Sequence, residues 1–261
     1  MSRIFSLLFS SRSPQQGGGR GVVVRLFSRV MRRLMRLILF ALLLPLAAIV
    51  VLRWLPAPCS SFMAIRQVER LLAGSVVPPM RYQWVSRARI SPYVPLAVIA
   101  AEDQRFPDHW GFDFNAISRA VDYNSASGKV RGASTISQQT AKNLFLWSGR
   151  SYLRKGLEAA LTLAIEALWS KERILEMYLN VAEFGDNVYG IHAAGQTFFG
   201  KTPDRLSRQE AALLAGVLPS PRRLHADQPS PYLLARAQWI SAHMGKLGGP
   251  RFLERLDNTR P

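Results

Sequence analysis

The apolar positions of the chain fall into one long run near the N-terminus and a series of shorter helical repeats after it. Residues 37–52 form an uncharged run of 16 residues, and flanking apolar residues extend it to 34–55. A helix of about 22 residues is about 33 Å long, which is enough to cross a bilayer. We therefore predict a transmembrane helix over residues 34–55, with an arginine near each end and a tolerated kink at Pro45.

The segment before this run is basic and rich in helix-breaking residues. It contains eight arginines and no acidic residue, and its stretch SRSPQQGGGRG has no periodic apolar pattern. We expect residues 1–30 to be disordered. Residues 1–33 are predicted to form a cytoplasmic basic arm, because positive charge marks the cytoplasmic side of a span, and the rest of the chain to be exported. A cleaved signal peptide is the alternative, but no small-x-small cleavage site follows the run.

After residue 55 the continuous apolar run gives way to helical periodicity. Residues 56–89 are predicted to be a connector with a short helix over 65–72, and the aromatic and basic segment Met80–Ile90 suits a membrane interface. Further on, apolar residues recur at helical spacing, most clearly from Tyr152 to Trp169. The predicted helices cover residues 95–106, 114–123, 135–146, 152–169, 171–180, 193–199, 207–218 and 231–247.

Capping signals separate these helices. Residues 124–134 are rich in Gly and Ser and predict a loop, after which Ser134 or Thr135 is the N-cap of the next helix, and Ser170 can cap another. No strand signal is convincing, and strands do not alternate with helices. We therefore predict a mainly α domain over residues 90–225, followed by a helical tail over 226–261.

Charge and cysteine content narrow the range of partners. The formal net charge is +17, and the part of the chain after residue 53 still has 25 basic and 17 acidic residues. Both parts favour an anionic partner, such as a membrane surface, a pyrophosphate or a nucleic acid. The apolar span and the predicted export weigh against nucleic acid. Cys59 is the only cysteine, so no intrachain disulfide can form, and we expect it to be a small, semi-buried residue.

Two glutamates bracket a polar segment that a structural core would not need. Glu102 lies in AEDQRFPDHWGFD, Glu158 ends GRSYLRKGLE, and RGASTISQQTAKN lies between them. Two carboxylates separated by hydroxyl, amide and cationic side chains suggest acid/base chemistry on a sugar with an anionic group nearby. On the residues alone, Glu102 and Asp103 could equally be solvated at a helix end. Glu158 could likewise form only a surface ion pair with Arg154, four residues earlier.

Taken in order, these segments resemble the peptidoglycan glycosyltransferase family, over about residues 90–225. The resemblance rests on EDQRFPDHWGFD, RGASTISQQTAKN, RKGLE, KERILEMYLN, GIHAAGQTFFGK and LSRQEAALLAGVLPSP. It implies a lysozyme-like helical glycosyltransferase domain that polymerises lipid II. The lipid-pyrophosphate-linked glycan would be transferred to the 4-hydroxyl of the acceptor GlcNAc, with inversion to a β-1,4 bond. The anchor, the short chain and the absence of a Ser-x-x-Lys motif point to monofunctional members without a transpeptidase domain.

The resemblance also assigns roles to matching positions. It implies that Glu102 is the general base for the acceptor hydroxyl, that Glu158 lies near the donor pyrophosphate, and that Asp103 supports the site. The remaining polar positions would hydrogen-bond sugar or phosphate, or bind the pyrophosphate through their positive charge. These substrate-binding candidates are Ser134, Thr135, Gln138, Gln139, Lys142, Asn143, Arg150, Arg154 and Lys155. A solvated basic face is the alternative for the cations, and plain helix capping is the alternative for the hydroxyls.

No cofactor is required by this chemistry, because pyrophosphate already activates the anomeric carbon. The four histidines are scattered, so we expect no dedicated metal site, although Mg²⁺ or Mn²⁺ could aid pyrophosphate binding. His109 is expected to form a structural hydrogen bond. The aromatic residues around it are expected to pack the fold: Phe106, Trp110, Phe112 and Phe114. By resemblance, residues 114–129 belong to a flexible lobe that touches the membrane.

Two other functions stay open from the sequence. A lytic transglycosylase or lysozyme-like hydrolase has a related helical fold, although here Glu102 is followed by Asp103 rather than Ser and no Gly-Leu-Met-Gln stretch occurs. A non-catalytic membrane scaffold of the wall-synthesis machinery would not need the polar motifs. The expected partners are lipid II, the growing lipid-linked strand, the bacterial inner membrane and other cell-wall synthesis or division proteins, with no nucleic acid. The catalytic domain would be periplasmic.

Overall fold

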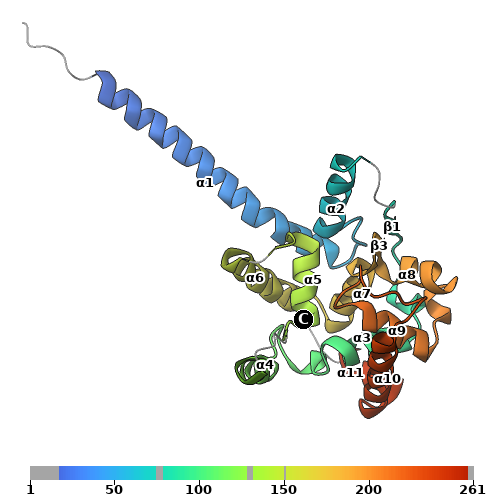
Figure 1. Ribbon diagram of the computed structural model, residues 1–261. Helices are drawn as coiled ribbons and strands as arrows, with labels where there is room; N and C mark the ends of the chain where they lie inside the picture. Colours follow the sequence, from blue (N-terminus) through green and yellow to red (C-terminus); the bar gives the residue numbers. More distant parts are fainter. Residues whose placement is uncertain (1–17, 75–78, 128–131, 150, 258–261) are drawn as a thin grey trace, which may run out of the picture. The chain divides into compact units, whose positions relative to one another are not determined.

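The computed structural model describes residues 18–74, 79–127, 132–149 and 151–257 (Figure 1). The chain divides into two compact units, Met1–Pro45 and Leu46–Pro261. Its helices are α1 (Gly18–Leu52), α2 (Ser61–Leu72), α3 (Tyr93–Glu102), α4 (Phe114–Ser127), α5 (Ile136–Phe145), α6 (Tyr152–Leu168), α7 (Lys171–Val181), α8 (Gly190–Phe199), α9 (Arg208–Val217), α10 (Pro231–Lys246) and α11 (Glu254–Asp257). Short 3₁₀ turns lie at Arg87–Arg89, Phe106–Asp108, Pro203–Arg205 and Gly249–Leu253. The mainly α prediction is confirmed.

The helix α1 includes the apolar run and part of the segment before it. Within α1, the segment Phe27–Leu52 contains an 18-residue window with a mean hydropathy of 2.7 and is long and apolar enough to cross a membrane. Because α1 begins at Gly18, the prediction of disorder over residues 1–30 is wrong from that residue onward. Helix propagation adds one hydrogen bond for each residue, which lets a long helix extend into a glycine-containing segment. Residues 1–17 lie outside the described part.

Within the second unit, the last turn of α1 is held by side chains at the junction of α6 and α7. The indole Nε1 of Trp169 donates to the carbonyl oxygen of Ile49 at 2.8 Å. The Arg173 guanidinium donates to the carbonyl oxygens of Leu52, at 2.8 and 3.1 Å, and of Leu55. Carbonyls at a helix C-terminus lack intrahelical donors, and these side chains supply them. The end of the predicted span is therefore fixed to the domain that follows it.

The helix α3 lies at the centre of the second unit. Every residue from Val94 to Ala100 is buried, and α3 packs against α9 and α10 (Figure 1). A helix that is apolar on all sides is one that the core surrounds. The helix ends at Glu102, so the prediction that it continues to Phe106 is wrong. Asp103 leaves the helical conformation, since its side chain binds other segments instead, and this competition is a common cause of helix termination.

The C-terminal helix α10 belongs to this same core. Its buried residues are Leu233, Ala237, Ile240 and Met244, which recur at helical spacing along one face. This face packs against α9 and α3. The segment assigned to a tail over residues 226–261 therefore contributes a wall of the domain rather than a separate appendage.

The described residues contain three short strands that the sequence did not predict. They are β1 (Arg81–Tyr82), β2 (Glu183–Gly185) and β3 (Val188–Tyr189), in the order β1-β3-β2. β1 is parallel to β3, and β2 is antiparallel to it. Strands of two or three residues are too short to show an alternating pattern. The turn between β2 and β3 contains Asn187 at φ 58°, a conformation that asparagine tolerates better than most residues.

Most helix predictions are confirmed, with local corrections. Thr135 and Ser170 are N-caps of α5 and α7, as predicted. α4 continues to Ser127, so the first four residues of the loop predicted over 124–134 are helical, and residues 128–131 lie outside the described part. The predictions of packing for Trp110 and Phe114 are wrong, since these side chains are 68% and 74% exposed. Phe106 is fully buried, and Cys59 is exposed rather than semi-buried.

The close approach of Gly190 to the end of α7 gives a test of this packing. Gly190 has φ +76°, and a Cβ there would lie 2.6 Å from the carbonyl oxygen of Asn180. We expect Gly190→Ala to lower the free energy of unfolding by about 3 kcal/mol or more. Gly200→Ala is the control, because Gly200 has φ +63° but a Cβ added there would meet open space, and the change should cost only about 1 kcal/mol. Thermal melts of the two variants that coincide would contradict the packing at Gly190.

Candidate active site

A cleft of about 940 Å³ lies at the C-terminal end of α3. It is lined by residues from the α3 end, from the start of α4 and α5, and from α10. These residues are Ala100, Ala101, Glu102, Asp103, Gln104, Arg105, Asp113, Ala116, Arg119, Ala120, Gly132, Ala133, Ser134, Thr135, Gln139, Pro219, Tyr232, Ala235, Arg236, Trp239 and His243. The cleft thus brings residues of the first two sequence motifs together with a helix that the sequence did not link to them.

Glu102 lies in this cleft with both carboxylate oxygens engaged. Its Oε2 accepts a hydrogen bond from Gln139 Nε2 at 2.9 Å, and its Oε1 lies 3.5 Å from Arg236 Nη2. The side chain is only 15% exposed. Burial raises the pKa of Glu102, while the Gln139 hydrogen bond and the charges of Arg236 and Lys142 lower it by less. A carboxylate with a raised pKa and a fixed orientation is suited to accept a proton.

Gln139 is itself held in place from α7. Its Oε1 accepts a hydrogen bond from the Tyr178 hydroxyl at 3.1 Å, and Tyr178 is fully buried. The donor on Gln139 is consequently turned toward Glu102. Tyr178 was not among the predicted site residues, although it lies in the quoted motif KERILEMYLN.

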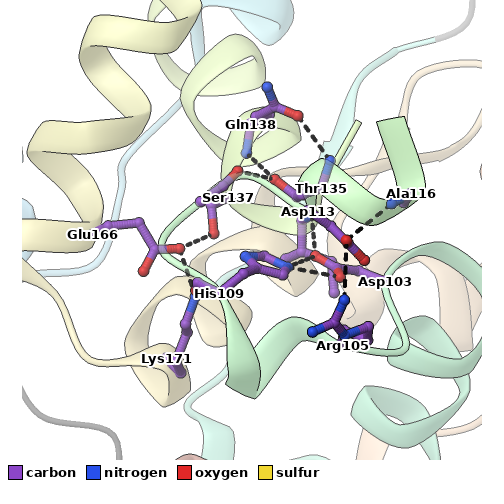
Figure 2. A network of polar contacts seen from close by, with 12 residues as sticks. Asp103, Arg105, His109, Asp113, Ala116, Thr135, Ser137, Gln138, Glu166 and Lys171 are labelled. Carbon is purple, nitrogen blue, oxygen red and sulfur yellow. Dashed lines mark hydrogen bonds and ion pairs between the residues drawn. The ribbon is translucent and has the colours of Figure 1, made fainter. Parts of the chain in front are cut away.

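Asp103 has a different environment from its neighbour Glu102. Its carboxylate is buried and accepts the backbone N–H of Ile136 at 3.0 Å and His109 Nε2 at 2.9 and 3.1 Å (Figure 2). It therefore joins the end of α3 to the N-terminus of α5 and to the loop that carries His109. These contacts give Asp103 a positioning role beside Glu102, and His109 makes the structural hydrogen bond that we expected.

A second buried network supports this loop and was not predicted. Lys171 Nζ donates to Glu166 Oε1 at 2.7 Å and to the carbonyl oxygen of His109 at 2.6 Å, and Ser137 Oγ donates to Glu166 (Figure 2). The ionic side chains are 6% and 4% exposed. Burial lowers the pKa of Lys171, and Glu166 opposes that change. Glu and Lys are common on protein surfaces, so nothing in the sequence distinguished Glu166 and Lys171 from exposed residues.

The predicted hydroxyl and amide positions have different surroundings, and Thr135 both caps α5 and lines the cleft. Thr135 and Gln138 form a capping box in which Gln138 Oε1 accepts the Thr135 N–H at 3.0 Å and Thr135 Oγ1 accepts the Gln138 N–H at 3.2 Å. Their polar groups build the start of α5. Ser134 and Gln139 line the cleft, and Ser134 is exposed there. The carbonyl of Asn143, further along α5, accepts a hydrogen bond from Ser61 at 3.1 Å.

Glu158 is the centre of a cationic cluster, which we define as Lys142, Arg154 and Lys155. Glu158 is 2% exposed and pairs with Arg154, at 3.1 Å, and with Lys155. A surface ion pair, the alternative left open by the sequence, is therefore wrong. Burial lowers the pKa of Lys142, and the charge of Glu158 opposes that change. Arg150, the remaining predicted cation, lies outside the described residues.

The described residues offer no ready set of metal ligands. In that part of the chain, no three side chains of His, Cys, Asp or Glu lie together in a group that could hold a metal ion. His109 is engaged with Asp103, and the other histidines are distant in sequence from it. The functional groups that line the cleft in the described part are carboxylates, amides, hydroxyls, cations and aromatic rings.

Comparisons with known proteins identify the family of this chain. The model of a family described as Transglycosylase matches residues 72–245, which include every described residue of the predicted site. The chain is 54% identical over 228 residues to the biosynthetic peptidoglycan transglycosylase of Cronobacter sakazakii, covering 87% of this chain and 95% of that protein. It is 52% identical over 235 residues to the protein of that description from Pseudomonas entomophila, covering 90% and 99%. The chain therefore belongs to the peptidoglycan transglycosylase family.

Proposed function

We propose that this glycosyltransferase of peptidoglycan synthesis polymerises lipid II, with Glu102 as the general base. The observation that carries the proposal is the largely buried Glu102 carboxylate in the cleft, which lies between Gln139 and Arg236. Lys142 of the cationic cluster lies on α5 three residues after Gln139, which is about one helical turn. The helix α5 therefore carries both a partner of Glu102 and a member of the cluster. A base and an anion site at this spacing fit a reaction between a sugar hydroxyl and a sugar pyrophosphate.

The proposed step transfers the glycan chain in one displacement. The 4-hydroxyl oxygen of the acceptor GlcNAc attacks the anomeric carbon of the donor, while its proton passes to the Glu102 carboxylate. The bond between that carbon and the pyrophosphate oxygen breaks, and its electron pair leaves with the lipid pyrophosphate. A single displacement inverts the α-linked donor to a β-1,4 bond. Burial favours this step because it strengthens Glu102 as a base, and Gln139 and Arg236 stabilise the ionised form that must begin it.

The cationic cluster would stabilise the departing pyrophosphate. Negative charge accumulates on that group in the transition state, and cations already fixed in place need no reorganisation to meet it. Glu158 holds Arg154 and Lys155 in position, so its proposed role is to organise the phosphate ligands rather than to react. No cofactor is needed for this step, and Mg²⁺ or Mn²⁺ would be an optional aid to pyrophosphate binding.

The two alternative functions make different products. A lytic enzyme would release anhydro-sugar fragments from finished peptidoglycan, and a scaffold would have no product. The purified chain should instead convert lipid-linked disaccharide into long glycan strands. Fragments from finished wall together with no strands from lipid-linked disaccharide would overturn the proposed function.

We also propose that α1 anchors the chain in the bacterial inner membrane, with the N-terminus cytoplasmic and the domain from residue 56 periplasmic. Eight arginines precede residues 37–52, and no acidic residue occurs before Glu69. A reporter enzyme that is active only outside the cytoplasm should be active when fused after Pro261. A stable, full-length fusion without reporter activity would reverse this orientation.

Replacement of the proposed base should remove catalysis without removing the fold. Glu102→Gln keeps the size of the side chain but cannot accept a proton, so the polymerisation rate should fall by about 10²–10⁴-fold. Glu69→Gln is the matched control, since Glu69 is an exposed residue of α2 outside the cleft. Initial rates on lipid-linked disaccharide and thermal melts of both variants check this. Near-normal turnover by a folded Glu102→Gln variant would exclude Glu102 as the base.

The positive charge of Arg236 should set the acid limb of the pH profile. A general base is active when ionised, so kcat/KM rises with pH through the pKa of Glu102. Because Arg236 lowers that pKa, Arg236→Gln should raise it further and move the acid limb to higher pH. Arg236→Lys keeps the charge and should shift the limb less. If the acid limb of both variants lies at the same pH as in the wild type, Arg236 does not affect the pKa of the catalytic base and this mechanism is contradicted.

Removal of the Lys142 ammonium should slow the reaction more than it weakens the fold. Taking one charge-assisted hydrogen bond away from the transition state raises the barrier by roughly 2–4 kcal/mol, so Lys142→Ala should lower the rate by more than an order of magnitude. Lys246→Ala is the control, since Lys246 is an exposed residue at the end of α10. Initial rates and thermal melts separate the two effects. Full activity of Lys142→Ala would place the pyrophosphate site elsewhere.

A further inference from the structure

One face of α10 carries aromatic and cationic side chains into the cleft. The aromatic and cationic residues of α10 that line the cleft recur at spacings of four, three and four residues, which is one stripe of a helix. They are Tyr232, Arg236, Trp239 and His243. The adjacent face of α10 is the apolar one that packs against α3 and α9. The stripe is therefore held on a rigid helix beside Glu102.

The aromatic rings of this stripe are accessible, and Trp239 is stacked on a neighbouring ring. Trp239 and His243 stack with ring centroids 3.8 Å apart and an interplanar angle of 28°. His243 Nδ1 donates to the carbonyl oxygen of Trp239 at 2.8 Å, which leaves Nε2 as the ring nitrogen for another partner. Trp239 is 45% exposed and Tyr232 is 62% exposed. Large aromatic surface left accessible in a polar cleft is typical of a ligand site.

The two carboxylate oxygens of Glu102 face different sides of the cleft. Oε2 faces Gln139 on α5, the helix that also carries Lys142 of the cationic cluster. Oε1 faces Arg236 on α10, which is also fixed by a hydrogen bond from its Nε to the carbonyl oxygen of Gly216 at 3.2 Å. The α5 side of Glu102 thus leads to the three cations of the cationic cluster, and the α10 side combines one cation, Arg236, with aromatic rings. An anionic leaving group suits the first side, and an uncharged sugar suits the second.

We propose that Tyr232 and Trp239 form a sugar-stacking wall that binds the acceptor disaccharide. This inference rests on the proposed function and adds the residues that hold the acceptor. The C–H faces of pyranose rings pack on aromatic rings, and the hydroxyl and acetamido groups at their edges can bond to Arg236 and His243 Nε2. Seven helical residues separate the two rings, which is about 10 Å along the axis and comparable to the length of one disaccharide.

The test uses two substrate analogues so that donor and acceptor roles are separate. A lipid-linked disaccharide whose terminal sugar lacks the 4-hydroxyl can only donate. A second analogue, in which a phosphonate replaces the departing phosphate oxygen, can only accept. Initial rates of the full chain are measured while each analogue is varied at a saturating concentration of the other. The variants are Trp239→Ala, Trp239→Phe and Tyr232→Ala, with Leu234→Ala as the control on the same helix but outside the cleft.

We expect Trp239→Ala to raise the KM of the acceptor by roughly tenfold or more, with a smaller change in the KM of the donor. Trp239→Phe should recover most of the loss, because it keeps an aromatic face, and Leu234→Ala should match the wild type. If Trp239→Ala lowers the melting temperature, Tyr232→Ala makes the same test at a more exposed side chain. A rise confined to the KM of the donor would show that the wall does not bind the acceptor. Unchanged KM values for both substrates would show that Tyr232 and Trp239 do not bind sugar. Both results require an active wild type, so they differ from failure of the proposed function.

Discussion

The buried carboxylate of Asp103 is the contact on which the geometry of the cleft depends. It accepts the first backbone N–H of α5 and the Nε2 of His109, so three segments meet at one side chain (Figure 2). A helix N-terminus favours a negative group at this position. Because Asp103 directly follows Glu102, the contact fixes Glu102, the proposed base, relative to Gln139 one turn into α5. The position of Glu102 in the cleft therefore follows from the termination of α3.

The ion pair of Glu166 and Lys171 stabilises the same loop from behind. Its two side chains are almost inaccessible, and their mutual attraction must offset a desolvation cost of several kcal/mol for each charge. The hydrogen bonds to Ser137 and to the His109 carbonyl complete the network. Such a pair contributes little net stability but leaves few alternative arrangements for the loop. We infer that its role is to keep His109, and through it Asp103, in a single position.

The sequence predicted those parts of the structure that depend on local patterns. Helical periodicity and N-caps located α5, α6 and α7 closely, and the resemblance of motifs selected Glu102. The contact between Arg236 and Glu102 spans 134 residues and arises only when α10 packs on α3. The burial of Lys171 and the short strands likewise depend on tertiary packing. The apolar face of α10 was periodic in the sequence, but nothing in that pattern showed which helix it would cover.

The cationic cluster explains how the substrate can complete the site. Burial lowers the pKa of Lys142, and the positive charges of Arg154 and Lys155 add to this change, while the charge of Glu158 opposes it. A pyrophosphate placed beside Lys142 would reverse this balance, since a nearby negative charge raises the pKa of an amine. Substrate binding and ionisation of Lys142 then favour each other. In the proposed reaction this coupling is strongest when the pyrophosphate departs, which is the moment at which stabilisation lowers the barrier.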